Sequence, residues 1–179
     1  MKTRAISLTI KPELCTDCKA CELACSFKKE GIYSPALSRI HVIQIYEYGV
    51  NVPIVCSNCD QAPCIDSCPS GAIGRLEEGG VVVIDEGLCS ACGDCVEVCP
   101  YGAVHMPLEL EVALMCDLCG GEPFCVESCL YGALKFDGKA DQLFSAINVE
   151  GLEGQDEARR WSLAETIAHD VSESWKVEA

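Results

Sequence analysis

The sequence predicts an α+β fold of short β-hairpins and single helical turns, with one amphipathic helix at its C-terminal end. Three observations lead to this prediction. Groups of closely spaced cysteines recur between Cys15 and Cys129, and short runs of β-branched residues separate them. A stretch beyond residue 155 then repeats apolar residues every three or four positions, which is the period of a helix.

The cysteines form four groups with one common spacing. Each group begins with Cys-x2-Cys, has a third cysteine after two to five further residues, and ends with Cys-x3-Cys. The segments "CPSGAI", "CPYGAV" and "CLYGAL" follow three of them, so a helical turn leading into a short strand is expected there. The groups are I (Cys15, Cys18, Cys21, Cys25), II (Cys56, Cys59, Cys64, Cys68), III (Cys89, Cys92, Cys95, Cys99) and IV (Cys116, Cys119, Cys125, Cys129).

Two β-hairpins are predicted between the groups. Residues 39–55, "RIHVIQIYEYGVNVPIV", are rich in β-branched and aromatic residues around a central glycine, and they link group I to group II. Residues 71–89 contain the apolar run "VVVI" behind the glycines that a tight turn requires, and they bridge groups II and III. After group IV, residues 133–144 predict a last strand and a turn.

The C-terminal stretch predicts a loose linker and then an amphipathic helix. "NVEGLEGQ" has the composition of a linker, and the acidic residues that follow it suit the positive end of a helix dipole. Two interpretations of the helix stay open: it packs on its own domain, or it docks onto another protomer or subunit. Its apolar face is expected to contain Trp161, Ala164, Ala168, Val171 and Trp175.

Cysteine content and compartment limit the chemistry. Sixteen cysteines are about 9% of the chain, a level typical of disulfide scaffolds, zinc sites or iron-sulfur clusters. The first residues lack the apolar segment of a secretory signal, and no apolar run approaches the roughly 20 residues of a membrane helix. We therefore expect a cytoplasmic protein, in which stable disulfides are disfavoured. Zinc is disfavoured because no group has a histidine at ligand spacing.

Charge and motif content exclude several functions. A formal net charge of -15 leaves no surplus of Lys and Arg to neutralise phosphates, which argues against a nucleic-acid partner and favours docking onto basic patches of proteins. The chain has neither a phosphate-binding glycine loop nor a nucleophile with an adjacent base, so no catalysis by this chain alone is expected. The histidines His41, His105 and His169 are scattered and are expected to be ordinary surface or core residues.

The cysteine spacing favours cubane iron-sulfur clusters. Cys-x2-Cys-x2-Cys places three thiolates on one tight loop, and in two-cluster ferredoxins the fourth comes from the other group. Group III, "CSACGDCVEVCP", matches this bacterial pattern, with Pro100 where the chain turns away; Pro69 has the same place in group II, whereas groups I and IV have Ser26 and Leu130 there. Sixteen ligands at four per cluster predict four [4Fe-4S] clusters.

With the four groups placed, residues 1–140 resemble the four-cluster electron-transfer subunits of molybdenum and tungsten oxidoreductases, of the type found in dimethyl sulfoxide reductase, polysulfide reductase and formate dehydrogenase complexes. The resemblance implies two ferredoxin-like halves of the bacterial dicluster type, related by pseudo-twofold symmetry. Residues 1–50 and 105–145 would form the half with groups I and IV, residues 51–104 the half with groups II and III, and residues 146–179 the linker and helix.

The same resemblance implies how the cysteines are shared. Each cluster would take three ligands from one group and the fourth from its partner group. Sequential pairing of group I with II and of III with IV remains an alternative. The implied sets are Cys15, Cys18, Cys21 with Cys129; Cys116, Cys119, Cys125 with Cys25; Cys56, Cys59, Cys64 with Cys99; and Cys89, Cys92, Cys95 with Cys68.

A narrower likeness concerns "CELACSFKKEGIYSPALSRIHV" and "MCDLCGGEPFCVESCLYGALKF". These stretches resemble the small iron-sulfur subunit encoded with tungsten-dependent aldehyde oxidoreductases. The likeness implies that electrons from aldehyde oxidation pass through four clusters to a flavin subunit or a ferredoxin, while the bis-pterin cofactor belongs to the partner.

Three functions follow for comparison. The first is an electron wire in an oxidoreductase complex, that is, a row of clusters through which single electrons pass. The second is a free polyferredoxin, and the third is a structural zinc-binding module. The acidic composition predicts clusters of low potential, because negative surroundings favour the oxidised state. The apolar stripe from Trp161 to Trp175 also suggests a homo-oligomer formed through the helix.

Overall fold

The strands form three small antiparallel sheets. The computed structural model describes residues 6–76, 80–108, 110–138 and 156–176, with residues 143, 147, 149 and 152 between the last two ranges. Strand β2 (Ile40–Ile45) pairs with β3 (Val50–Val55), and β4 (Ile73–Arg75) pairs with β5 (Val82–Ile84). Both predicted hairpins are therefore confirmed. The third sheet pairs β1 (Thr9–Ile10) with β6 (Leu134–Lys135), which joins the two ends of the cysteine-rich region.

The helices are short, with two exceptions. The described helices and 3-10 turns are η1 (Pro12–Leu14), α1 (Ala20–Glu30), η2 (Pro35–Leu37), α2 (Pro63–Asp66), α3 (Asp94–Val98), η3 (Leu118–Gly121), α4 (Phe124–Glu127) and α6 (Asp156–Lys176). Helix α1 begins inside group I and continues beyond its last cysteine, which the sequence patterns did not predict. It ends at Gly31, which adopts the left-handed conformation with a φ of 71° and donates its N–H to the Phe27 carbonyl at 2.9 Å.

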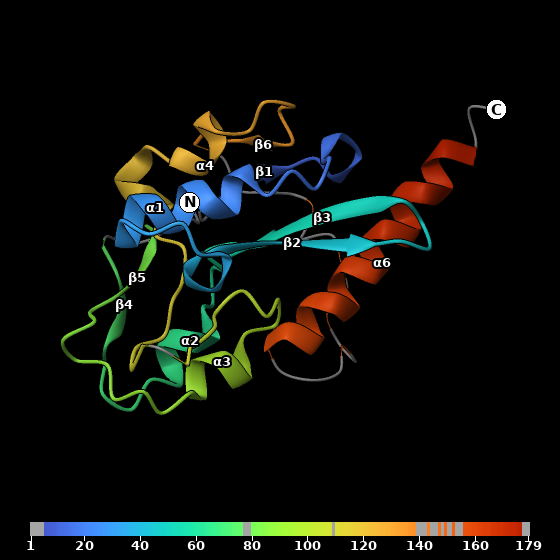
Figure 1. The fold of residues 1–179 in the computed structure, drawn as a ribbon. Helices are drawn as coiled ribbons and strands as arrows, with labels where there is room; N and C mark the ends of the chain where they lie inside the picture. The colour runs from blue at the N-terminus through green and yellow to red at the C-terminus, as the bar shows by residue number, and fades with distance from the viewer. Residues whose placement is uncertain are drawn as a thin grey trace.

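The helical turns associate in pairs. Helix α1 contacts α4, so segments of groups I and IV lie side by side, and α2 contacts α3, which joins segments of groups II and III. In Figure 1 the first pair lies at the top with β1 and β6, and the second pair lies at the bottom. The β2–β3 hairpin extends from between them along α6. No helix in the described ranges is long and apolar enough to cross a membrane.

Helix α6 packs on the chain's own hairpin. Leu163, Ala164, Ile167 and Ala168 are at most 1% exposed, and α6 contacts both β2 and β3. The expected face was only partly correct: Ala164 and Ala168 are buried, but Trp161 and Trp175 are 45% and 49% exposed. The indoles flank a stripe whose centre is Leu163 and Ile167, four residues apart, so the stripe is rotated from the predicted one. The linker at 146–155 lies almost entirely outside the described residues.

Candidate metal centres

The loops that contain the cysteines have an unusual backbone. Side-chain-bearing residues seldom adopt a positive φ, yet seven do so in the described ranges, and all seven lie inside the four cysteine groups. Such turns reverse the chain within two residues and direct successive N–H groups and thiols to the same side. Strained conformations concentrate where a site requires them. The residues are Asp17, Lys19, Asn58, Ala62, Ala91, Leu118 and Cys119.

Two cavities have four cysteines each in their lining. The first has about 340 Å³ of empty space, part of it open solvent, and combines three cysteines of group I with the last cysteine of group IV. The second has about 320 Å³ and combines three cysteines of group IV with the last cysteine of group I. Their cysteines are Cys15, Cys18, Cys21 and Cys129 in the first, and Cys116, Cys119, Cys125 and Cys25 in the second.

The fourth cysteine of group III lies among the first three of group II. Burial is the first cause of the raised pKa of those three thiols, and the charge of Cys99 is a further cause for each. They are Cys56, Cys59 and Cys64. Conversely, Cys68 of group II adds to the raised pKa of Cys95, as do Cys89 and Cys92.

The thiols form donor sets that require positive charge. Burial raises the pKa of Cys21, Cys64 and Cys116 to about 12, and that of Cys95 to about 11. Thiolates are the ligands that iron requires, and here burial and the neighbouring thiols disfavour the thiolate form. Sets of four thiols that include such buried members fit a cationic iron-sulfur core, which would supply the missing positive charge. In the described ranges, no three His, Cys, Asp or Glu side chains are grouped as a site for a single metal ion.

Backbone N–H groups also donate to two cysteine sulfurs. The N–H of Arg39 donates to Cys25 Sγ and that of Ala103 donates to Cys99 Sγ, both at 3.3 Å. Charge-assisted hydrogen bonds of this kind stabilise a thiolate and hold its side chain in one orientation. Both receiving thiols are the fourth cysteines of their groups, which reach across to another loop.

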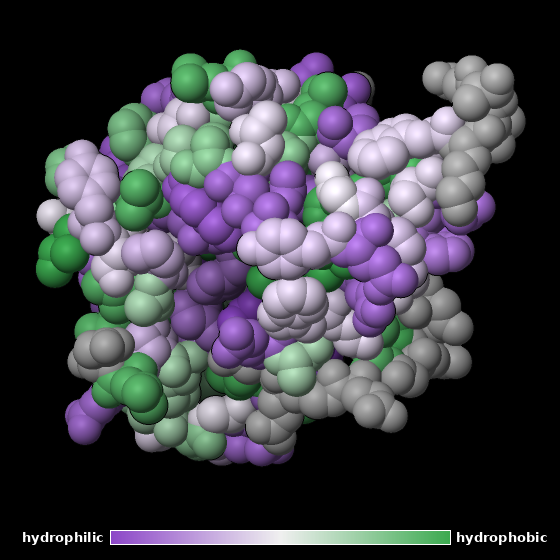
Figure 2. Space-filling view, turned by 45° about the vertical axis from the view of Figure 1, so that its right-hand side comes forward, coloured by the Kyte–Doolittle hydropathy of each residue, from purple (hydrophilic) through white to green (hydrophobic). Residues whose placement is uncertain are grey.

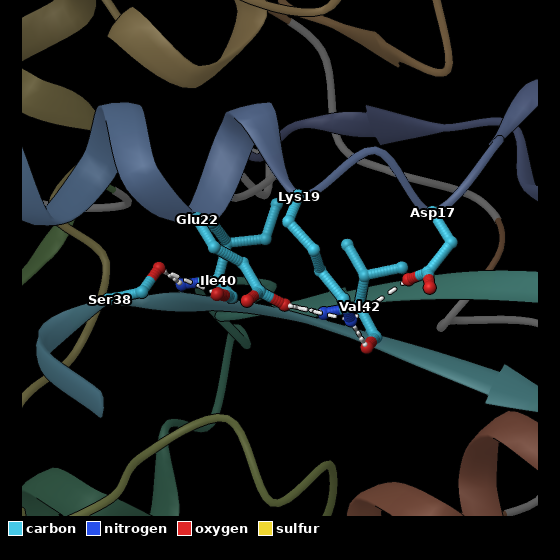
Figure 3. A network of polar contacts seen from close by, with 6 residues as sticks. All are labelled: Asp17, Lys19, Glu22, Ser38, Ile40 and Val42. Carbon is cyan, nitrogen blue, oxygen red and sulfur yellow. Dashed lines mark hydrogen bonds and ion pairs between the residues drawn. The ribbon is translucent and has the colours of Figure 1, made fainter. Parts of the chain in front are cut away.

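A polar network fixes the group I loop on β2 (Figure 3). Buried Glu22 accepts the Val42 N–H at 2.5 Å, and Lys19 donates to the Val42 carbonyl at 2.5 Å while it pairs with Asp17 at 2.9 Å. Burial raises the pKa of Glu22, opposed by the Val42 N–H and by the charge of Lys19. These residues were not predicted from the sequence; the available signal was the charged side chains placed between the cysteines of group I.

Asn58 has the same role in the group II loop. It is fully buried, donates to the Ile6 carbonyl at 3.0 Å and accepts the Val82 N–H at 2.8 Å. One amide therefore joins this loop to β5 and to the start of the chain. Of the three histidines, His41 and His105 lie together, with Nε2 and Nδ1 at 3.3 Å, and His169 is exposed on α6.

The surface around these loops is mixed in polarity. Figure 2 shows hydrophilic residues gathered across the middle of one face, where they line a hollow, with hydrophobic residues scattered around it. Among all sixteen cysteines, only Cys18 and Cys92 are exposed. These two belong to different cysteine sets, one in the first cavity and one in group III.

The chain is similar to known iron-sulfur proteins. Residues 48–139 match the family described as 4Fe-4S dicluster domain, and residues 12–28 match a 4Fe-4S binding domain. The "Aliphatic sulfonate oxidoreductase, polyferredoxin-like subunit" of Pyrococcus furiosus is 42% identical over 66% of this chain and 68% of that protein. The "Probable anaerobic dimethyl sulfoxide reductase chain YnfG" of Escherichia coli is 40% identical over 68% of each chain.

A solved structure is also similar. One chain in the "Active site complex BamBC of Benzoyl Coenzyme A reductase in complex with Benzoyl-CoA" is 28% identical, with coverage of 92% of this chain and 95% of that chain and a TM-score of 0.45.

Proposed function

The chain belongs to the 4Fe-4S dicluster domain family, and on that basis we propose that it is an electron-transfer subunit with four [4Fe-4S] clusters arranged as a wire. The observation that supports the proposal is the crossing of the cysteine groups: two cavities each join three cysteines of one group to the last cysteine of another, and Cys99 and Cys68 affect the pKa of thiols in another group. Its relatives include named subunits of oxidoreductases, so this chain is not proposed to be catalytic alone.

The ligand sets follow the crossed pairing of groups I with IV and II with III. The cavity linings support the first pair of sets, and the effects of Cys99 and Cys68 on other groups' thiols support the second. We name each set a quartet, after the group that gives three of its cysteines. The group I quartet is Cys15, Cys18, Cys21 and Cys129; the group IV quartet is Cys116, Cys119, Cys125 and Cys25; the group II quartet is Cys56, Cys59, Cys64 and Cys99; the group III quartet is Cys89, Cys92, Cys95 and Cys68.

Electrostatic effects between thiols of different quartets support a linear order. The charge of Cys21 adds to the raised pKa of Cys125, which links the group I and group IV quartets. Burial is the first cause of the raised pKa of Cys56 and of Cys64. The charge of Cys116 is a further cause for Cys56, which links the group IV and group II quartets, and the charge of Cys95 is a further cause for Cys64, which links the group II and group III quartets. The proposed order is therefore group I, group IV, group II and group III.

The exposed cysteines support two ends for this wire. Cys18 belongs to the first quartet of the order and Cys92 to the last, whereas the cysteines of the two middle quartets are buried or half-buried. When bound, each cluster supplies one reversible electron-accepting centre. The chain's own residues fix the thiols in sequence, exclude water from the middle quartets and leave one ligand accessible at each end.

A catalytic subunit with a molybdenum- or tungsten-pterin cofactor is the proposed partner at one end, and a flavin subunit or another acceptor is the proposed partner at the other. The narrower candidate is a tungsten aldehyde oxidoreductase, supported by two sequence stretches, residues 21–42 with the end of group I and residues 115–136 with all of group IV. An affinity-tagged chain purified from its host tests this. Copurification of a polypeptide with tungsten or molybdenum, and cluster reduction on addition of an aldehyde, are expected.

The free polyferredoxin gives a different outcome. A chain that purifies alone with a full set of clusters, and whose clusters no host oxidoreductase reduces, contradicts the subunit proposal. The zinc module gives a third: a colourless protein with stoichiometric zinc and no reducible centre. Metal analysis and visible absorption on the same preparation separate the three functions.

A further inference from the structure

Two arginines contact the backbone of ligand residues in the group II quartet. Arg159, near the start of α6, donates from Nη1 to the Cys99 carbonyl at 2.6 Å and to the Glu97 carbonyl at 2.8 Å. Arg75, at the end of β4, donates from Nη2 to the Cys59 carbonyl. Both guanidinium groups are half-buried, so water screens their charge less than on an open surface.

The charges beside the group IV quartet are arranged differently. There Lys29 pairs with Asp117 at 2.5 Å and Arg39 pairs with Glu30 at 2.6 Å, so a carboxylate offsets each cation. The ion pairs found within the described ranges do not include Arg75 or Arg159. The partners found for both are carbonyl oxygens, which leave the positive charge of the guanidinium group in place.

We propose that Arg159, acting through Cys99 and together with Arg75, raises the reduction potential of the cluster in the group II quartet relative to the other three. The inference rests on the proposed function, because it takes the quartets as ligand sets. Reduction adds one electron, and so one negative charge, without making or breaking a bond. A fixed positive charge beside the ligands stabilises the reduced state more than the oxidised state.

The helix that positions Arg159 lies outside the matched family region, residues 48–139. Two anchors fix its start against group III: the guanidinium of Arg159 on Cys99, and that of Arg160, which donates to the Gly102 carbonyl at 2.8 Å. Further along, Leu163 and Ile167 are buried against the hairpin. The C-terminal helix therefore adds a positive charge to a site that the family domain itself encloses.

Redox titration of the reconstituted full chain, followed by EPR, tests the proposal with Arg159→Gln and Arg159→Lys. In Arg159→Gln one of four cluster signals is expected to shift to lower potential. At a fixed ambient potential its reduced-to-oxidised ratio should fall on the order of tenfold, which is about 59 mV for a one-electron couple. Arg159→Lys retains the positive charge. At the same fixed potential, the reduced-to-oxidised ratio of each cluster in this variant should therefore stay within about twofold of the ratio in the unmodified protein.

Two further variants complete the experiment: one assigns the shifted EPR signal to a quartet, and the other provides a second test of the charge effect. Cys99→Ser should alter the same EPR component that Arg159→Gln shifts, because both act on one quartet. Arg75→Gln should independently lower the reduction potential of the same cluster. If Arg159→Gln binds less iron than the unmodified protein, Arg75→Gln provides the test in its place. Unchanged potentials in both glutamine variants, or equal shifts of all four signals, would overturn the inference and leave the proposed function intact. Fewer than four clusters in the unmodified protein would overturn the proposed function itself.

Discussion

The residues between the cysteines determine the shape of the cluster loops as much as the cysteines do. Lys19 and Asn58 adopt left-handed conformations that glycine adopts more easily, and their side chains also form hydrogen bonds with distant strands; Asp17, in the same conformation, forms an ion pair with Lys19. A glycine would adopt the turn without strain but would lose those contacts. The strained residues therefore combine a tight turn with a tertiary anchor.

Asn58→Ala is expected to lower the free energy of unfolding by about 2 kcal/mol, because the Val82 N–H and the Ile6 carbonyl lose their buried partner. Asn51→Ala is the matched control: it removes one hydrogen bond, to the Cys15 carbonyl, at a half-buried position, and should cost about 1 kcal/mol or less. Denaturant unfolding of both holoproteins provides the comparison. Equal losses would show that Asn58 is not a special anchor.

The paired histidines, of which His105 is buried and His41 is half-buried, make the fold sensitive to acid. Burial is the first cause that lowers the pKa of both; His105 adds to the effect on His41, and the charge of Arg160 acts on both. The charge of Lys19 further lowers the pKa of His41. For His105, the Ala36 carbonyl raises the pKa and the charge of Arg39 lowers it, and the pKa falls to about 4.

The sign of the pH effect follows from these lowered pKa values. Below pH 6.5 these histidines become protonated in the unfolded chain but stay neutral in the folded chain. The free energy of unfolding should therefore fall from pH 6.5 towards pH 4, by up to about 1.4 kcal/mol per pH unit for His105 alone. The melting temperature of His105→Gln should therefore change less steeply across this range than that of the unmodified protein. Parallel curves for the two proteins would contradict the assignment.

At the scale of elements, regular patterns were predictable and short pairings were not. The β2–β3 hairpin follows from two β-branched runs around Gly49, and α6 follows from its repeat of apolar residues. The β1–β6 sheet has only two residues per strand and joins positions about 125 residues apart, so no local pattern indicates it. The rotation of the buried stripe on α6 depends on the hairpin that it covers.

In the candidate site, too, local features could be predicted from the sequence and long-range contacts could not. The four cysteine groups could be recognised from their spacing, because the pattern of one loop is local in sequence. Glu22, Arg75 and Arg159 could not, since the hydrogen bonds that connect them to other loops and strands join residues 15 to 62 positions apart in sequence. Long charged side chains that bond to backbone carbonyls leave no periodic signal in a sequence.

Packing of α6 on the hairpin predicts unequal effects within the helix. Ile167→Ala removes a side chain that is 1% exposed and should lower the free energy of unfolding by about 3 kcal/mol. Trp161→Ala removes a larger side chain that is 45% exposed and should cost less than about 1 kcal/mol. Thermal or chemical unfolding of the two variants measures the difference. The reverse ranking would mean that the tryptophan face is buried against another molecule.

For the molecule as a whole, the clusters are expected to form part of the core. Eight of the sixteen cysteines are buried, and burial raises the pKa of Cys21, Cys64, Cys116 and Cys125 among them, as expected for thiols that lack a compensating positive charge. Hydrogen exchange should therefore accelerate in the cysteine loops when iron is chelated. Amides in β2, β3 and α6 should keep more of their protection, because those elements share apolar contacts such as Val52 and Leu163. Uniform loss of protection would contradict this division.

The central claim, that four quartets of cysteines hold four redox-active clusters, is tested most directly by spin quantitation. The full chain, reconstituted anaerobically and fully reduced, should give an EPR spectrum of interacting centres that integrates to about four spins per chain, with about sixteen iron atoms. An integral of about two spins or fewer at full occupancy, or zinc in place of iron with no spin at all, would contradict the claim.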